Sequence, residues 1–340
     1  MGDVVLLVPV VRSVVATYPD VEVTVVTRPK FASFFTDIER VVPFPADVDY
    51  TYNGVFGMRE LFAKLLRRGE YDVVIDMHDH IRTMVLRTLF KMFGVPVIVF
   101  QKGRNEKKKF TQKENKVTRP LPHTVQRYQQ AFENAGFPVT LVSPPYINLK
   151  ETTNEEVTGW LASKGINKNE KWVGIAPFAM HTTKIWPLKN YSELIRDLAK
   201  KKNIRFFLFG GGEKEIAFFQ QLQTEFPAHC HIVAGELKIK QELSLMKRLD
   251  AMVCVDSSNM HFATLLGIPV ISIWGGTHPH VGFGPLGGNE ENLLQVSRDE
   301  LPCRPCSVYG RETCYRGDFA CLNRITSLQV ADIVLRNLND

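Results

Sequence analysis

The sequence lacks long uncharged apolar runs and has few cysteines, and each shortage excludes a class of protein. No apolar run reaches the roughly 18 to 20 residues that span a bilayer, so we expect the chain to fold in water. The apolar start from Val4 to Val15 follows no basic region and is interrupted by Pro9 and Arg12, unlike a secretory leader. Six cysteines in 340 residues are too few for a secreted disulfide scaffold. We therefore expect a cytoplasmic protein with reduced thiols.

The net charge of +6 is modest but unevenly spread, because residues 102–119 concentrate lysine and arginine with few apolar positions. We expect a loop there, and a solvated, mobile surface is the favoured interpretation. The sharper alternative is a basic collar that attracts an acidic acceptor or anionic lipid headgroups. No aromatic residues alternate with the charges, as base stacking would need, so we expect no nucleic-acid partner.

Short β-branched runs alternate with stretches of helical periodicity along most of the chain. A first series runs from VEVTVV at residue 21, through the strand YDVVID at residue 71 and a helix near residues 80–92, to VPVIVF at residue 95. A second runs from WVGIA at residue 172, through a helix from about Leu188 to Lys202, to PVISIW at residue 269. Such alternation is typical of βαβ units and a parallel sheet. The sequence therefore predicts two open α/β sheets in tandem.

The polar segment 150–171 is the expected boundary between two domains, since 340 residues exceed the usual size of one hydrophobic core. We expect an N-terminal domain over 1–160, a C-terminal domain over 161–322, and a terminal helix over 323–340 that packs back on the N-terminal domain. Ligands of open parallel sheets bind at the carboxyl ends of the strands, and two such domains can share a cleft there. Functional motifs should therefore follow strands.

A polar turn follows the strand AMVCV and starts a helix; its residues are Asp256, Ser257, Ser258, Asn259 and His261. Either serine can cap the helix, and the free N–H groups of the first turn suit a pyrophosphate. Asp256 can accept hydrogen bonds from sugar hydroxyls. The plainer alternative is an ordinary helix cap with a core histidine.

Two more polar turns follow strands of the second series. After WVGIA, Thr182, Thr183 and Lys184 offer two hydroxyls and one ammonium, which suit the oxygens of a leaving nucleotide diphosphate. After IRFFLF, Gly212 allows close backbone approach, and Glu213 is placed to bind ribose hydroxyls. Each turn on its own is equally compatible with an exposed loop.

Asp3 lies at the start of an apolar helical pattern, where the helix dipole favours its ionised form. A carboxylate at the mouth of a cleft can act as general base on an acceptor hydroxyl. Helix capping is the simpler alternative.

Together, in this order, these motifs resemble glycosyltransferase family 9, the ADP-heptose:lipopolysaccharide heptosyltransferases. The motifs that carry the resemblance are Gly2-Asp3, His123-x3-Arg127-Tyr128, Thr182-Thr183-Lys184-x-Trp186-Pro187, the glycine turn with Glu213, and Asp256-Ser257-Ser258-x-Met260-His261 with Ala263, Leu266-Gly267 and Pro269.

The resemblance implies an α/β fold of the GT-B type, with two Rossmann-like domains that face each other across a cleft. It implies a metal-independent, inverting transfer of a heptose or related sugar from an ADP-sugar to a lipopolysaccharide core-type acceptor, with no cofactor. Asp3 would then be the base, and Lys184 with Thr182 and Thr183 would hold the phosphates. Glu213 would contact the nucleoside, and Asp256 with its neighbours would hold the pyrophosphate and the sugar.

The implied acceptor is a lipid-linked saccharide, with peripheral contact to the inner membrane. Candidate acceptor-binding residues are Lys102, Arg104, Lys107 and Arg127. The alternatives are another nucleotide-sugar enzyme, such as an epimerase or hexosyltransferase, and a non-catalytic nucleotide-sugar binding protein.

The sequence departs from the family pattern in two places. Relatives carry an apolar strand before the Gly-Asp pair, so the first sheet is expected to lack its central strand here, and we expect the true start codon to lie upstream of Met1. Ser257-Ser258 stands where relatives more often have Thr-Gly or Ser-Gly, which leaves the donor sugar open.

Four cysteines cluster near the C-terminus, namely Cys303, Cys306, Cys314 and Cys321. The first two have metal-ligand spacing, but the last two do not. Free or partly paired thiols are the favoured interpretation, with a structural zinc as the alternative. His278 and His280, beside Thr277, are expected to contact sugar or phosphate rather than a metal.

Overall fold

The computed structural model describes every residue except 118, 168, 202 and 340. Thr118 of the basic stretch, Lys168 of the expected domain boundary, Lys202 at an expected helix end and Asp340 of the terminal helix therefore lie outside the described residues.

The chain divides into two compact units, and it passes between them more than once. The first unit comprises 1–103 and 122–148, and the second comprises 104–121 and 149–340. Residues 104–121 and 149–160, which the sequence analysis assigned to the N-terminal domain, thus belong to the second unit.

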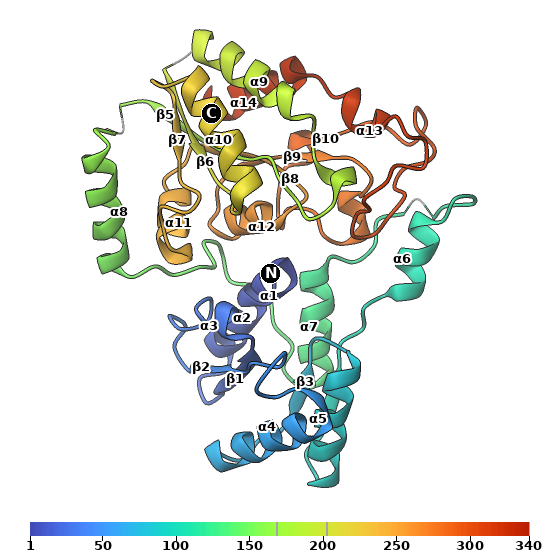
Figure 1. The fold of residues 1–340 in the computed structure, drawn as a ribbon. Helices are drawn as coiled ribbons and strands as arrows, with labels where there is room; N and C mark the ends of the chain where they lie inside the picture. Colours follow the sequence, from blue (N-terminus) through green and yellow to red (C-terminus); the bar gives the residue numbers. More distant parts are fainter. Residues whose placement is uncertain (118, 168, 202, 340) are drawn as a thin grey trace. The chain divides into compact units, whose positions relative to one another are not determined.

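The second unit contains a parallel α/β sheet (Figure 1). Its strands are β5 (Lys171–Ala176), β6 (Ile204–Leu208), β7 (Cys230–Ile232), β8 (Ala251–Val255), β9 (Val270–Trp274) and β10 (Leu293–Gln295). Its α-helices are α6 (Arg104–Thr111), α8 (Glu151–Ser163), α9 (Leu188–Lys201), α10 (Glu213–Glu225), α11 (Ile239–Met246), α12 (Ser258–Leu265), α13 (Ala320–Asn323) and α14 (Ser327–Asn339). Short 3₁₀ turns are η1 (Thr182–Lys184), η2 (Pro279–Val281) and η3 (Glu290–Asn292).

The strand order of this sheet, β10-β9-β8-β5-β6-β7, fixes where a ligand can bind. Strands β8 and β9 are buried at every residue, as expected for central strands covered on both faces. The chain moves outward from β5 to β7 and then returns to place β8 on the other side of β5. The loops after β5 and β8 therefore leave the sheet at its topological switch point, where open α/β sheets bind their ligands.

The first unit contains two separate strand pairs instead of one sheet. Its elements are α1 (Gly2–Val5), α2 (Val8–Thr17), β1 (Val23–Thr27), α3 (Pro29–Ala32), β2 (Val41–Pro45), α4 (Gly54–Arg68), β3 (Val74–Asp76), α5 (Ile81–Met92), β4 (Val97–Val99) and α7 (Thr124–Asn134). Strand β1 pairs with β2 and β3 pairs with β4, both in parallel. No ladder joins the two pairs among the described residues.

The basic stretch is not the loop that the sequence predicted, because residues 104–111 form helix α6. Lys107 and Phe110 lie three residues apart, so they share one face of the helix. Phe110 is buried against Leu121 and Val281 of the same unit. Charge alone does not predict this apolar contact, which stabilises the helix and holds the segment in the second unit.

The C-terminal helix α14 also differs from expectation. Its apolar stripe, formed by Val330, Ala331, Val334 and Leu338, lies in the core of the second unit. The helix packs beside α9 of the same unit, so this apolar stripe is buried within the second unit.

Among the described residues, no helix is both long enough and apolar enough to cross a membrane.

Candidate active site

The loops after β5, β8 and β9 bring three polar side chains of the second unit together. Lys184, in the turn after β5, forms an ion pair with Asp256, which follows β8, at 3.1 Å between Nζ and Oδ2. The hydroxyl of Thr277, which follows β9, donates to the same Oδ2 at 2.8 Å. Both charged side chains are nearly buried, at 13% and 11% exposure. The ion pair is therefore shielded from solvent, and its Coulomb attraction is stronger than at the surface.

Helix α12 begins beside this cluster, with Ser257 at its N-cap position. The predicted cap bond is absent, because the Ser257 side chain accepts no hydrogen bond from the first turn. Its Oγ is buried and has no hydrogen-bond partner in the described part of the chain. Since a buried hydroxyl without a partner is costly, this atom is a candidate ligand contact next to the free N–H groups of the helix.

The hydroxyls of the two threonines before Lys184 bond to backbone groups of residues 311–312 and so hold the loop in place. Thr183 is buried; its hydroxyl donates to the carbonyl of Arg311 at 2.9 Å and accepts from the Arg311 N–H at 2.8 Å. The Thr182 hydroxyl donates to the carbonyls of Arg311 and Glu312. Both contacts tie the phosphate loop that the sequence predicted to the cysteine-containing segment.

Two glycines let the β9 loop approach Thr183 closely. A Cβ on Gly275 would lie 2.4 Å from the carbonyl oxygen of Thr183, and one on Gly276 would lie 3.0 Å from its Cβ. The Gly276 N–H donates to the Thr183 carbonyl at 2.8 Å. Side chains here would push the two loops apart and separate Thr277 from Lys184.

Arg304, which is 1% exposed, holds the other side of the β9 loop. Its guanidinium donates to the carbonyls of Gly275 at 3.0 Å and Thr277 at 3.1 Å, and to Gln295 Oε1 at 3.1 Å. Burial lowers the pKa of Arg304 to about 10, so it stays charged at neutral pH. This buried cation fixes the carbonyls on either side of Gly276 and so orients Thr277 toward Asp256.

The glycine turn after β6 places its acidic residues differently. Gly212, with a φ of 92°, is the N-cap of α10, and Glu213 is exposed in the first turn of that helix. Glu215 accepts the Gly211 N–H at 2.8 Å, and burial raises its pKa. Glu213 is thus the carboxylate of this turn that is open to a ligand.

Two histidines of the second unit, His261 and His278, are buried. His261 is buried in the first turn of α12. His278 is buried, and its Nδ1 accepts the His280 N–H at 3.1 Å. Burial and the nearby Arg304 and Arg298 lower the pKa of His278 to about 2, so its imidazole is neutral.

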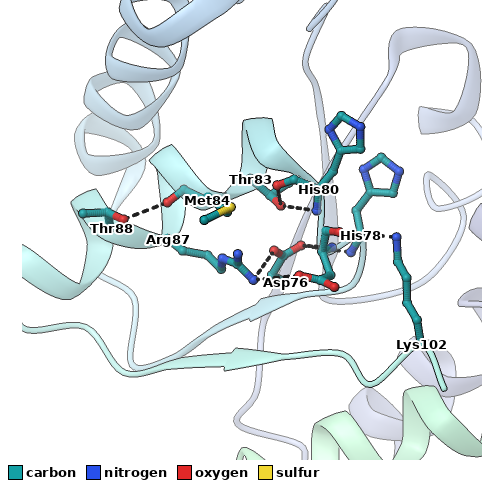
Figure 2. A network of polar contacts seen from close by, with 9 residues as sticks. Asp76, His78, His80, Thr83, Met84, Arg87, Thr88 and Lys102 are labelled. Carbon is teal, nitrogen blue, oxygen red and sulfur yellow. Dashed lines mark hydrogen bonds and ion pairs between the residues drawn. The ribbon is translucent and has the colours of Figure 1, made fainter. Parts of the chain in front are cut away.

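In the first unit, a second polar group forms at the end of β3 (Figure 2). The Asp76 carboxylate accepts the N–H groups of His78 and Asp79, at 2.9 and 3.0 Å. The Arg87 guanidinium pairs with the carboxylates of Asp76 and Asp79. The Lys102 ammonium donates to the Asp79 carbonyl at 3.4 Å. The turn that carries His78 is thereby fixed from several sides.

The rings of His78 and His80 stack, with centroids 5.4 Å apart and planes at 14°. Figure 2 shows both rings pointing away from the Asp76–Arg87 ion pair. Burial lowers the pKa of His78, as do Lys102 and His80, while the carboxylates of Asp76 and Asp3 oppose the shift. Asp3 therefore lies within electrostatic reach of this turn.

Asp3 and Arg127 are held close to the same region. Asp3 is exposed in α1, and its carbonyl accepts the Tyr128 hydroxyl of α7 at 3.0 Å. A Cβ on Gly103 would lie 2.5 Å from the Arg127 guanidinium, so that guanidinium lies against the backbone next to Lys102. Asp3, Lys102 and Arg127 are thus gathered in the first unit.

The other two candidate acceptor residues belong to the second unit. Arg104 begins α6, and Lys107 is only 5% exposed, with its ammonium 4.2 Å from the ring centroid of Phe283. Lys107, a candidate acceptor-binding residue, is thus largely buried and lies against Phe283, whereas the sequence predicted a solvated surface for this stretch. The four clustered cysteines have free thiols, and no group of metal ligands is found among the described residues.

Comparison with known proteins identifies the family. Residues 59–312, well over half of the chain, match the model of glycosyltransferase family 9 (heptosyltransferase).

The chain belongs to glycosyltransferase family 9.

Similar members of the family include the lipopolysaccharide core heptosyltransferase OpsX of Haemophilus influenzae, which is 23% identical over 98% of this chain and 92% of that protein. Lipopolysaccharide heptosyltransferase 2 of Escherichia coli is 30% identical over 34% of each chain.

Solved structures of family 9 proteins share the fold. A family 9 glycosyltransferase of Veillonella parvula gives a TM-score of 0.77 at 16% identity, over 99% of this chain and 94% of that one. ADP-heptose lipopolysaccharide heptosyltransferase II of E. coli gives 0.69 at 18% identity, over 99% and 96%. The predicted α/β fold of the GT-B type and the prediction of a heptosyltransferase-family glycosyltransferase are therefore confirmed.

Four residues of the candidate sites in this family 9 chain were not predicted from the sequence, namely Thr277, His78, His80 and Arg304. His78 and His80 directly follow a predicted strand, so the rule that located Asp256 also applies to them. Arg304 gave no such signal, because nothing in its sequence neighbourhood shows that this loop residue will be buried and will donate to four backbone carbonyls.

Proposed function

We propose that the protein transfers a heptose or a related sugar from ADP-heptose to a lipopolysaccharide core-type saccharide, in one inverting displacement that needs no metal. The observation that carries the proposal is the cluster of Lys184, Asp256 and Thr277 at the switch point of the second unit's sheet. The E. coli heptosyltransferase WaaC has been crystallised with ADP and with ADP-2-deoxy-2-fluoro heptose, and it shares the fold at TM-scores of 0.66 and 0.65.

The donor diphosphate would bind at the start of α12. Lys184 and the N–H groups of the first turn, around Ser258 and Asn259, supply positive charge there, and the Ser257 hydroxyl supplies a donor that has no acceptor among the residues that the structure describes. This charge stabilises the diphosphate as it leaves, which is the task that a divalent cation performs in many other transferases. Glu213 would accept hydrogen bonds from the ribose hydroxyls.

Asp256 would contact the donor sugar while it stays bonded to Thr277. Because Asp256 Oδ2 already pairs with Lys184, an incoming phosphate competes for the lysine and frees one acceptor position on that oxygen, which still accepts from Thr277. A sugar hydroxyl can then replace the ammonium as its hydrogen-bond partner.

Asp3 would act as the general base. The acceptor hydroxyl attacks the anomeric carbon, its proton passes to the Asp3 carboxylate, and the bond to the diphosphate oxygen breaks with its electron pair leaving on ADP. Lys102, Arg127 and the pair His78 and His80 lie near Asp3 and would bind the acceptor. The acceptor is lipid-linked, so we place the reaction at the cytoplasmic face of the inner membrane.

Calorimetric titration with ADP, ADP-heptose, UDP and GDP in the presence of a chelator tests the donor. Selective binding of ADP and ADP-heptose supports the proposal. Preference for UDP or GDP would instead indicate a hexosyltransferase or an epimerase. Binding of ADP-heptose without turnover, when a lipopolysaccharide core acceptor is supplied, would indicate a non-catalytic binding protein.

A further inference from the structure

A pocket in the second unit lies where two of its helices begin. Helix α9 starts at Leu188 and α14 starts at Ser327, and Figure 1 shows the two helices side by side. The pocket has a volume of about 430 Å³, within the range of about 300 to 1,000 Å³ that is usual for small-molecule sites. Its lining includes none of Lys184, Asp256 and Thr277, so the pocket is separate from the proposed diphosphate site.

The lining of this pocket is polar, and its charges balance. Its polar side chains are Lys189, Asn190, Glu193, Asn323, Thr326 and Ser327. They include one ammonium and one carboxylate, which balance at neutral pH, and otherwise amides and hydroxyls, which both donate and accept hydrogen bonds. Pro187 and Ile325 add an apolar side to the pocket. This combination suits an uncharged ligand that carries hydroxyl groups around an apolar ring face.

The side chain of Asn190 lines the pocket without a hydrogen-bond partner among the described residues. Asn190 is only 7% exposed, and its main-chain N–H donates to the Pro187 carbonyl at 2.9 Å, which leaves the side-chain amide for other partners. Burying an amide without a partner is unfavourable, so such a group marks a place for a ligand or a water molecule. A ligand hydroxyl can satisfy it, because a hydroxyl accepts from the amide NH₂ and donates to the amide oxygen.

Glu193 supplies a second group for the same ligand. The Ser327 hydroxyl donates to Glu193 Oε2 at 3.2 Å, and this bond joins the start of α14 to α9. The other carboxylate oxygen, Oε1, makes no hydrogen bond or ion pair within the described part of the chain, so it can accept from a ligand hydroxyl. The hydroxyl of Thr326 and the amide of Asn323 are already bonded within the protein. The available groups are therefore concentrated on Asn190 and Glu193, which lie three residues apart on one face of α9.

We propose that this pocket binds an uncharged sugar unit, whose hydroxyls bond to the Asn190 amide and the Glu193 carboxylate. The first N–H groups of two helices favour an anion in such a place, but the Glu193 carboxylate repels one. A sugar meets both conditions, because its hydroxyls donate to the carboxylate and accept from the N–H groups. This second site is additional to the proposed function, since it lies outside the donor cluster and binds without a transfer step.

Nuclear magnetic resonance of the full chain tests the proposal. The side-chain amide signal of Asn190, identified by its loss in Asn190→Leu, should shift and saturate with at least one of D-glucose, D-galactose, D-mannose and free heptose at millimolar concentrations. Inorganic phosphate at the same concentrations should leave the signal in place. For the sugar that binds, its disaccharide is titrated next. Tighter binding of the disaccharide assigns the site to one unit of a longer saccharide, and equal binding assigns it to a free monosaccharide; both results support the proposal.

Substitutions separate a ligand-binding amide from a structural one. Asn190→Leu should weaken sugar binding by about tenfold, as expected for one or two lost hydrogen bonds, and Glu193→Gln should weaken it several-fold. Asn292→Leu is the matched control, because Asn292 is 5% exposed but its amide is paired with that of Asn337. The control should bind sugar normally and unfold at a lower temperature. Asn190→Leu should keep its melting temperature, because it removes no side-chain hydrogen bond of the described chain.

Equal sugar binding by Asn190→Leu and the unsubstituted chain would overturn the proposal, and so would an Asn190 signal that none of the four sugars moves. A shift with phosphate instead of sugar would overturn it in favour of an anion site. A lower melting temperature for Asn190→Leu would assign the amide to the fold and count against a ligand role. These outcomes do not depend on transfer activity. Failure of the ADP titration leaves a positive sugar result standing, so the two proposals fail separately.

Discussion

The two units of this protein hold their candidate functional residues in different ways. In the second unit, Lys184, Asp256 and Thr277 are nearly buried and bonded to one another at the ends of three adjacent strands. In the first unit, Asp3 is exposed, and the candidate residues lie on a short helix, a turn and a strand end around two separate strand pairs.

This difference matches the two kinds of substrate in the proposed reaction. A diphosphate offers the same charged group each time, so a pre-organised and partly buried cation binds it at little ordering cost. A large saccharide on a lipid has to be bound on an open face, and exposed side chains provide it. The comparison predicts that substitutions in the second unit change donor affinity or stability, whereas those in the first unit change turnover or acceptor use.

The largest effect is expected from Asp3→Asn. Loss of a general base should lower kcat by about 10² to 10⁴. Donor affinity should stay unchanged, since Asp3 belongs to the other unit. Single-turnover kinetics with calorimetry measure the two quantities, and Asp20→Asn serves as an unrelated acidic control. A weakened donor affinity with normal kcat would break the comparison.

Arg304→Met should produce the largest loss of stability. It leaves the buried carbonyls of Gly275 and Thr277 without donors, at a cost of about 3 kcal/mol in the free energy of unfolding. Denaturant titration measures it, and Arg316→Met, on an exposed pair with Asp318, is the control that should lose far less, because solvent screens that pair. A similar loss of stability in both variants would show that the hydrogen bonds of Arg304 to the β9 loop do not stabilise the fold.

Lys184→Ala should weaken ADP binding by about 30-fold, the equivalent of one lost charge-assisted hydrogen bond of about 2 kcal/mol. Lys189→Ala, an exposed lysine of α9, should leave the affinity intact. The dissociation constants from calorimetry decide this. Unchanged affinity in the Lys184 variant would place the diphosphate elsewhere.

The smallest effect concerns acid stability through His278. Its pKa is about 2 in the folded chain, below the ordinary value of about 6.5, so the unfolded chain binds the proton more tightly. Stability from the neutral ring is thus complete above about pH 6.5 and falls as the pH drops, by about 1 kcal/mol near pH 5.5. His278→Asn should flatten this slope between pH 8 and pH 5.5, as followed by thermal unfolding. An unchanged slope would assign the effect to other groups.

Elements with strong periodicity could be predicted because their burial is local. The strand AMVCV is β8 residue for residue, and the predicted helix over 80–92 is α5 to within one residue. By contrast, α6 was not predicted, because Phe110 is one apolar residue in a basic run. Its burial depends on Leu121 and Val281, which lie outside that helix in the sequence. The separate strand pairs of the first unit show the same limit, since β pairing requires a neighbour that the sequence of one strand does not specify.

The candidate site could be predicted in part, because the position of a residue at a strand end is a local feature of the sequence. The strand-end rule located Lys184 and Asp256, because both directly follow buried strands. It did not show that they pair with each other, nor that the hydroxyls of Thr182 and Thr183 are bonded to the 311–312 segment. Hydrogen-bond partners more than a hundred positions apart cannot be read from local pattern.

The sequence by itself determined the α/β class, the alternation of strands with helices and the strand ends at which polar residues gather, because alternating burial and turn chemistry act over a few neighbours. Only the tertiary structure decided which of those residues meet, that Arg304 is buried beneath the β9 loop, that Lys107 packs on Phe283, and that Asn190 and Ser327 line one pocket. Those outcomes depend on contacts between distant segments, whose energies exist only once the chain has folded.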